Sequence, residues 1–128
     1  MKKSGILHPD LNALLAASGH TDMITICDRG FPVPLEPQRI DLALVEGIPT
    51  VLDVLRAVAA EWGVDRVVVA QEMLEASPDH AAAIRAIVDP APLEVVSHLE
   101  LKRLAHEARG TIRTADPTPW GNIILISG

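Results

Sequence analysis

The chain has 128 residues and a mass of 13.7 kDa, the size of one domain and too little for two ordinary ones. Hydrophobic residues make up 48% and charged residues 22%, a composition that excludes an intrinsically disordered chain. The net charge is −6 and no basic run is long enough to follow a phosphate backbone, so we expect no nucleic acid partner. Residues 1–128 are therefore predicted to form a single folded domain.

No apolar run approaches the roughly 18 residues that a membrane span requires. Lys2 and Lys3 resemble the start of a signal peptide, but His8 interrupts the short apolar stretch that follows them. We expect a cytoplasmic protein that does not associate with a membrane. A single cysteine, Cys27, excludes an intramolecular disulfide and a cysteine-based zinc site, and no two histidines have the helical spacing of a zinc pair. Neither a metal nor another cofactor is expected.

The first half of the chain predicts one helix and two strands. Residues 9–18 are expected to form a helix, because Pro9 suits a first turn and Gly19 follows as a stop. Residues 23–27 (MITIC) form a β-branched run typical of a buried strand, which ends at Asp28. A loop with three prolines follows, and a short strand is expected over residues 40–44.

The second half alternates helices with strands. Thr50 is expected to open a helix that ends before Gly63, with Asp53 completing a capping box. Further helices are predicted over residues 77–88 and 98–109, and strands over residues 66–70, 93–97 and 123–126. Because several strands are apolar on both faces, we expect an α/β fold, a single layered domain whose central, mostly parallel sheet is flanked by helices.

Two polar residues bound the first predicted strand. His20 follows a helix-ending glycine at the entry to the strand, and Asp28 comes directly after its last residue. Ordinary alternatives are a histidine hydrogen-bonded to Asp22 or to backbone, and an aspartate that caps the loop amides of Arg29 or Gly30. Together they offer an acid/base group and an acceptor on one element. A strand of this length could also hold them at its opposite ends, and in that case their pairing requires another subunit.

The turn at residues 117–122 (PTPWGN) offers a second candidate site. Trp120 provides an aromatic face and Asn122 an amide, a combination that suits a polyhydroxylated ligand, although packing and turn formation explain the same residues. Cys27 is rejected as a nucleophile, since a thiol inside an aliphatic strand is usually buried and inert. His8 and His80 are interpreted as structural residues at predicted helix starts.

Six stretches carry a resemblance to a known family: residues 1–7 (MKKSGIL), 18–22 (SGHTD), 26–34 (ICDRGFPVP), 39–44 (RIDLAL), 47–49 (GIP) and 120–125 (WGNIIL). They resemble the D-ribose pyranase and L-fucose mutarotase family, whose members interconvert cyclic forms of free sugars. The resemblance spans the chain from end to end. The pair formed by SGHTD and ICDRGFPVP is much more specific than any single motif.

The resemblance implies roles for particular residues. His20 corresponds to the family's catalytic proton donor, and sugar contacts correspond to Asp28, His98, Trp120, Gly121 and Asn122. Tryptophan replaces the family's tyrosine at Trp120, and Arg29 stands where a small residue is common. His98 aligns with a histidine of the ribose branch, where the fucose branch tends to carry arginine. The family also implies a ring-like homo-oligomer, a homodecamer, with active sites between subunits and no cofactor.

The leading hypothesis is an isomerase that converts β-D-ribopyranose to β-D-ribofuranose by general acid–base catalysis of ring opening and closing. One alternative is a mutarotase for another sugar such as L-fucose, suggested by Trp120 and Arg29. A second alternative is an oligomeric module that binds a sugar without turnover. Binding alone has no need of a titrating imidazole, so the presence of both His20 and Asp28 favours the enzyme.

Overall fold

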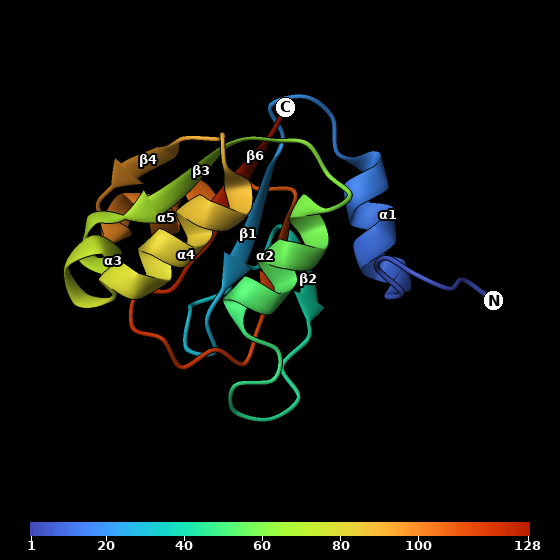
Figure 1. Cartoon of the computed structure of the whole chain (residues 1–128), viewed down its shortest axis with the longest axis horizontal. Helices are drawn as coiled ribbons and strands as arrows, with labels where there is room; N and C mark the ends of the chain where they lie inside the picture. The colour runs from blue at the N-terminus through green and yellow to red at the C-terminus, as the bar shows by residue number, and fades with distance from the viewer.

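The computed structural model describes residues 1–128 as one α/β domain, in which helices cover both faces of a six-stranded sheet (Figure 1). The strands are β1 (Met23–Cys27), β2 (Gln38–Asp41), β3 (Val64–Ala70), β4 (Leu93–Val96), β5 (Gly110–Arg113) and β6 (Ile123–Ser127). The helices are α1 (Pro9–Ala17), α2 (Val51–Ala59), α3 (Gln71–Ala76), α4 (Pro78–Val88) and α5 (His98–Ala105). None of them has the length and hydropathy needed to cross a bilayer.

The sheet is mixed, whereas the sequence led us to expect a mostly parallel one. In the strand order β2-β5-β1-β6-β3-β4, β6 runs antiparallel to both of its neighbours, and the other pairs are parallel. The reason lies in residues 114–122, which follow β5 without a helix. A parallel pair needs a crossover connection, but this segment stays at the edge where β5 ended and enters β6 from there.

Alternation along the strands gives the sheet two apolar faces with separate cores. The larger core joins one face to α1, α2, α3 and α4 through Leu11, Leu14, Val51, Leu55, Met73, Ile84, Ile24, Ile26, Val67, Val69, Ile112, Ile123 and Leu125. The smaller core joins the other face to α5 through Cys27, Phe31, Val68, Ala70, Leu101, Ala105, Ile124 and Ile126. Figure 1 shows this division, with α2, α3 and α4 on one side of the sheet and α5 on the other.

Several local predictions are confirmed. The strand at residues 23–27 is β1, and its last four residues are buried. The capping box of α2 is present: the Asp53 N–H donates to Thr50 Oγ1 at 3.1 Å, and the Thr50 N–H donates to Asp53 Oδ2 at 2.9 Å. This helix ends at Ala59, earlier than expected. The strand expected over residues 40–44 lies at Gln38–Asp41 instead, directly after Pro37.

Two elements were missed. The helix expected over residues 98–109 ends at Ala105, and Gly110 begins β5 rather than stopping the helix. A Cβ at residue 110 would lie 2.8 Å from Leu14 Cδ2 and 3.2 Å from the Gln38 carbonyl oxygen, so a side chain at this position would require Leu14 and β2 to shift. The short helix α3 (Gln71–Ala76), directly after β3, was also not predicted.

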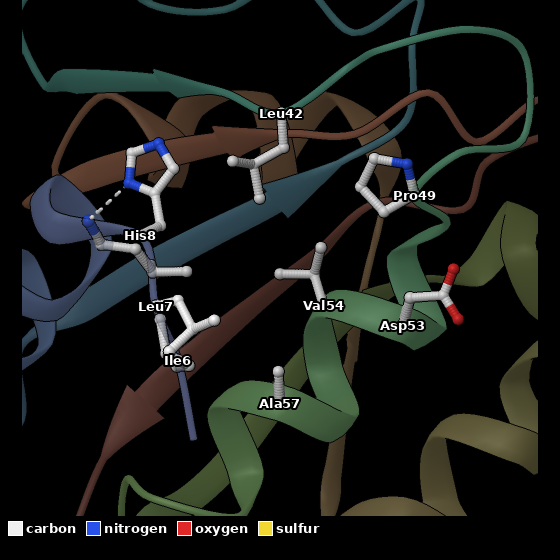
Figure 2. Close-up of a pocket in the computed structure, with 9 residues that line it drawn as sticks. Ile6, Leu7, His8, Leu42, Pro49, Asp53, Val54 and Ala57 are labelled. Carbon is white, nitrogen blue, oxygen red and sulfur yellow. Dashed lines mark hydrogen bonds between the residues drawn. The ribbon is translucent and has the colours of Figure 1, made fainter. Parts of the chain in front are cut away.

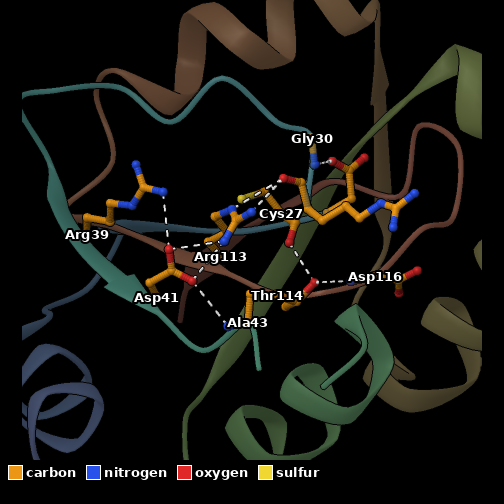
Figure 3. A network of polar contacts seen from close by, with 10 residues as sticks. Cys27, Gly30, Arg39, Asp41, Ala43, Arg113, Thr114 and Asp116 are labelled. Carbon is orange, nitrogen blue, oxygen red and sulfur yellow. Dashed lines mark hydrogen bonds and ion pairs between the residues drawn. The ribbon is translucent and has the colours of Figure 1, made fainter. Parts of the chain in front are cut away.

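Ion pairs and hydrogen bonds fix the sheet edge at which the parallel strands end (Figure 3). Arg113 Nη1 lies 3.1 Å from Asp41 Oδ1, and Arg113 Nη2 donates to the Arg29 carbonyl at 3.0 Å. Thr114 Oγ1 donates to the Cys27 carbonyl at 2.8 Å. These contacts join the ends of β1, β2 and β5, which makes this edge a rigid base for the loops above it.

Candidate functional site

A cavity of about 380 Å³ opens at the same edge of the sheet. Its walls are Asp28, Gly30, Phe31, Pro32, His98, Pro119, Trp120 and Asn122. Its size lies at the small end of the range of ligand pockets, roughly 300–1,000 Å³. Four residues predicted to contact a sugar therefore line one pocket: Asp28, His98, Trp120 and Asn122.

The topology explains why residues so distant in sequence meet here. Asp28 follows β1, and His98 begins α5 one residue after Ser97, close to the end of β4. Because β6 is antiparallel to β1, its first residues lie beside the last residues of β1, and this places Asn122 next to Asp28. Carboxyl ends of parallel strands are the usual ligand-binding edge of α/β sheets.

The Asn122 side chain links the Asp28 backbone to His98. Its Oδ1 accepts the Asp28 backbone N–H at 2.8 Å, and its Nδ2 lies 3.3 Å from His98 Nε2. Since the amide oxygen already accepts a backbone hydrogen, the amide nitrogen faces His98 and donates to it. His98 can accept at Nε2 only as a neutral imidazole with its proton on Nδ1.

Burial shifts both titratable groups of the pocket toward their neutral forms. It lowers the pKa of His98 from 6.5, and the nearby charge of Lys102 lowers it further. Burial raises the pKa of Asp28 from 3.8, although the N–H groups of Gly30 and Phe31 oppose this shift by bonding the carboxylate. A neutral His98 agrees with the hydrogen bond that it accepts from the amide of the pocket.

Two aromatic side chains hold the His98 ring from its sides. The Phe31 ring lies edge-to-face with it at 6.1 Å and 83°, and the Trp120 ring at 4.9 Å and 78°. Trp120 is 41% exposed, so part of the indole remains open to the cavity and solvent. An open aromatic surface beside an amide, an imidazole and a carboxyl suits a ligand with both C–H faces and hydroxyls.

His20 is exposed and lies at the opposite edge of the sheet from this pocket. The Thr21 N–H donates to the Ser127 carbonyl at 2.9 Å, which places His20 beside the start of β1 and the end of β6. At about 3.3 Å per residue the five residues of β1 separate its ends by roughly 16 Å. His20 therefore cannot reach the pocket of its own chain.

The carboxylate of the nearby Asp22 accepts the Gly19 N–H and pairs with Arg109 Nε, both at 2.7 Å.

Gly121 is buried and is not part of the pocket wall. Its N–H donates to the Thr118 carbonyl at 3.2 Å, and its carbonyl lies 3.1 Å from His80 Nε2. His80 was predicted only as a residue at a helix start, because no local pattern links positions 41 residues apart. Phe31 and Glu72 were not predicted at the site either; the Glu72 carboxylate accepts the His98 backbone N–H at 3.1 Å.

A second hollow, of about 240 Å³, lies between the N-terminal segment, the residues after β2 and α2 (Figure 2). Its walls are mostly apolar, with Ile6, Leu42 and Val54 among them. The two titratable residues there already serve helix starts: His8 Nδ1 accepts the Leu11 N–H, and Asp53 belongs to the capping box of α2. The rest of the lining is predominantly apolar, so this hollow offers no cluster of polar groups comparable to that of the first pocket.

The thiol of Cys27 is buried, and burial together with the nearby charge of Asp28 raises its pKa to about 12. A thiol with so high a pKa is a poor nucleophile, as the sequence predicted. No group of three or more His, Cys, Asp or Glu side chains lies in an arrangement that could hold a metal ion.

The fold and the pocket define a single-domain α/β protein with a small polar and aromatic site at the carboxyl edge of its sheet. The family model described as RbsD / FucU transport protein family matches residues 1–128. The chain belongs to this family.

Relatives and solved structures agree with this assignment. A D-ribose pyranase from Geobacillus thermodenitrificans is 48% identical over 128 residues, which cover 100% of this chain and 97% of that protein. The structure of Bacillus subtilis RbsD complexed with D-ribose has a TM-score of 0.95 and 39% identity, and covers 100% of this chain and 98% of that one. A fucose mutarotase from Streptococcus pneumoniae complexed with L-fucose has a TM-score of 0.71 at 15% identity, covering 95% and 93%, and shows the same fold.

Proposed function

We propose that this protein interconverts the cyclic forms of free D-ribose, most simply β-D-ribopyranose and β-D-ribofuranose. The observation that carries the proposal is the single pocket that holds Asp28, His98, Trp120 and Asn122. Full-length similarity to a D-ribose pyranase and to a ribose-bound structure supports ribose as the substrate. The fucose mutarotase is far more distant in sequence.

The reaction needs proton transfer. Opening a cyclic hemiacetal requires a proton at the ring oxygen and the loss of one from the anomeric hydroxyl, and closure through another hydroxyl reverses both transfers. An imidazole that titrates near neutral pH can perform each transfer. General acid–base assistance typically contributes ~10²–10⁴-fold, which is adequate for a reaction that also proceeds without a catalyst.

We assign the proton transfers to His20 of a neighbouring subunit. The Asp28 carboxylate and the Asn122 and His98 side chains position sugar hydroxyls, and Trp120 offers a surface for the C–H face of the ring. The backbone groups of Gly121 are already bonded within the chain, so its contribution is to shape the loop that carries its neighbours.

The same assignment implies a ring-like homo-oligomer, a homodecamer in our proposal, acting in the cytoplasm. Two observations support assembly. His20 is too far from the pocket of its own chain to act there, and the loop after β2 exposes Leu44, Val45 and Ile48 by 75%, 57% and 55%. Clustered exposed side chains of this kind are typical of protein contact surfaces.

Saturation-transfer NMR on equilibrated D-ribose tests the activity directly. We expect the protein to accelerate exchange between pyranose and furanose signals, and His20→Ala to lose that acceleration. His106→Ala is a matched control, because the side chain of this exposed histidine bonds Glu36 on the surface and does not line the pocket. Background exchange with the intact protein would overturn the ribose assignment.

The two alternatives predict different results. A mutarotase for L-fucose would accelerate anomeric exchange of that sugar more strongly than ribose exchange in a sugar panel. Arg29 does not favour a fucose mutarotase, because its Nη1 lies 2.8 Å from Glu46 Oε1 and the residue does not line the pocket. A binding module without turnover would give a calorimetric signal with ribose while exchange stayed at background.

A further inference from the structure

The loop that carries Trp120 is held from behind by the first turn of α4. Ser77 Oγ donates to the Pro119 carbonyl at 2.9 Å, and His80 Nε2 lies 3.1 Å from the Gly121 carbonyl. The two bonded carbonyls belong to the residues immediately before and after Trp120. Ser77 and His80, both at the start of α4, therefore hydrogen-bond the backbone on either side of Trp120.

Ser77 serves this loop instead of its own helix. Serine at the N-cap position normally accepts a backbone N–H of the first turn. Here Ser77 occupies the N-cap of α4, but its side chain makes no capping hydrogen bond. Its hydroxyl donates 42 residues along the chain, to Pro119. The Ser77 hydroxyl therefore holds the loop at Pro119 and does not cap α4.

The backbone of Trp120 needs such support. Its φ is +59°, the left-handed region that residues with a Cβ rarely adopt. Such a conformation persists only where the surroundings impose it. A return of Trp120 to negative φ would turn the indole away from its 4.9 Å contact with His98 and displace Asn122, two residues further on.

The hydrogen bond from His80 to the loop is buried. The His80 side chain is buried at the base of the loop, and a carbonyl partner requires that Nε2 carry the proton. A Cβ at residue 121 would lie 3.3 Å from this Nε2 and 3.1 Å from the Thr118 carbonyl oxygen, so glycine permits the close approach. Without the imidazole, the Gly121 carbonyl would lose its side-chain partner in a buried place.

We propose that Ser77 and His80 are positioning residues for the sugar pocket. They hold Trp120 in its left-handed conformation and thereby set the indole and the Asn122 amide at the distances that a sugar meets. They touch no part of the cavity themselves. The effect on catalysis rests on the proposed function, whereas the effect on the Trp120 conformation does not.

The test compares His80→Leu with His80→Gln. Leucine fills a similar volume without a donor, and the glutamine amide nitrogen can take the place of Nε2. Protein labelled with 5-fluorotryptophan gives one ¹⁹F line for Trp120 and one for Trp62, which is buried in the larger core and serves as an internal reference. We expect the leucine variant to move only the Trp120 line and to raise KM for ribose about tenfold, with kcat changed less. The glutamine variant should restore both.

His8→Leu is the matched control. His8 also stands at a helix start and its ring bonds a backbone N–H, but it lies at α1, away from the pocket. Its loss should leave the Trp120 line and the ribose KM unchanged. If His80→Leu folds with both quantities unchanged, or if His80→Gln behaves like leucine, the proposal is overturned.

Ser77→Ala provides a second test if His80→Leu does not fold. This half-buried position tolerates alanine, and we expect a smaller movement of the same Trp120 line and a roughly twofold to threefold higher KM. An unmoved line would count against the proposal. If the unaltered protein accelerates no sugar exchange, the proposed function fails, and the ¹⁹F comparison still decides whether Ser77 and His80 hold Trp120.

Discussion

Asn122 donates a hydrogen bond from its amide nitrogen to His98 Nε2, across 3.3 Å at the base of the pocket. The direction of this bond is determined by the amide oxygen, which accepts the Asp28 backbone N–H. One side chain thus fixes the tautomer of the imidazole and the position of the residue that follows β1. Changes at Asn122 are therefore expected to alter the titration of His98 as well as sugar binding.

Asn122→Asp should raise the pKa of His98. The aspartate keeps an oxygen for the Asp28 N–H but presents a second oxygen to Nε2, and this favours the protonated imidazole. The wild-type pKa lies below 6.5, and we expect the variant value to move upward, with exchange activity at neutral pH reduced at least about tenfold. A proton NMR titration of the His98 Hε1 signal measures it. Asn12→Asp on α1 adds the same charge elsewhere, and equal titration curves for the two variants would contradict the bond.

Asp28→Asn should abolish exchange and stabilise the fold at neutral pH. Because burial raises the folded-state pKa of Asp28, its stabilising contribution is complete below 3.8 and is lost as the pH rises through the folded value. At pH 7 the partly buried, ionised Asp28 carboxylate therefore lowers the free energy of unfolding of the wild type, and the neutral amide of Asp28→Asn has no such effect. We expect a gain of less than about 1 kcal/mol in the free energy of unfolding, since the group is partly exposed.

Chemical denaturation at pH 7 and pH 3.5, at one protein concentration, checks this stabilisation. The advantage of Asp28→Asn should shrink at the lower pH, where the wild-type carboxyl is protonated. A variant that is less stable than the wild type at pH 7 would show that the charged carboxylate is favourable in the fold.

Thr25→Val should stabilise the protein. Thr25 and Thr111 are partners in the parallel register of β1 and β5, and their buried hydroxyls have no hydrogen-bond partner. Removing one of these hydroxyls should raise the free energy of unfolding by about 1 kcal/mol. Thr114→Val is the matched control at equal burial, because its hydroxyl bonds the Cys27 carbonyl and the Asp116 N–H. That change should lower stability by about 1–3 kcal/mol, and an identical sign for both variants would be inconsistent with the hydrogen-bond pattern.

His20→Ala and Asp28→Asn should complement each other in mixed assemblies. Each variant alone lacks one part of every site, but a site built from two chains can receive an intact Asp28 from one and an intact His20 from the other. Random mixing of equal amounts should restore about one quarter of wild-type exchange. Co-expression with two affinity tags, followed by exchange NMR on the doubly tagged assembly, measures the recovery. Activity no higher than the sum of the separate variants would place the reaction within one chain.

Short-range patterns predicted the elements that are built from neighbouring residues. The run MITIC became β1, and Thr50 with Asp53 became a capping box, because both depend on contacts within a few residues. Predicted boundaries of helices and strands were wrong where a residue distant in sequence packs against the segment. Gly110 was expected to stop a helix, but it begins β5, where Leu14 of α1 and the Gln38 carbonyl of β2 pack against it.

The residues of the candidate site also fall into two groups, those that the sequence predicted and those that it did not. Four of the contact residues implied by the family resemblance line one pocket. Strand order did not predict this, because in the mostly parallel sheet that we expected, Asn122 before β6 would lie at the edge opposite Asp28; the antiparallel direction of β6 brings the two together. The sequence left open whether His20 and Asp28 meet or lie at opposite ends of a strand, and the structure places them at opposite ends. The sequence contained no sign of His80, whose bond to the Gly121 carbonyl spans 41 residues.

The class of fold, the family and the residues with suitable chemistry could be predicted from the amino-acid sequence, because composition, periodicity and recognisable stretches of the chain indicate them. The folded chain was needed to show that β6 runs antiparallel, that Asn122 sets the tautomer of His98, and that side chains at the start of α4 bond the loop around Trp120. Each of these depends on hydrogen bonds between segments that are remote in sequence. Such pairings are selected by how the whole chain packs and leave no local pattern to read.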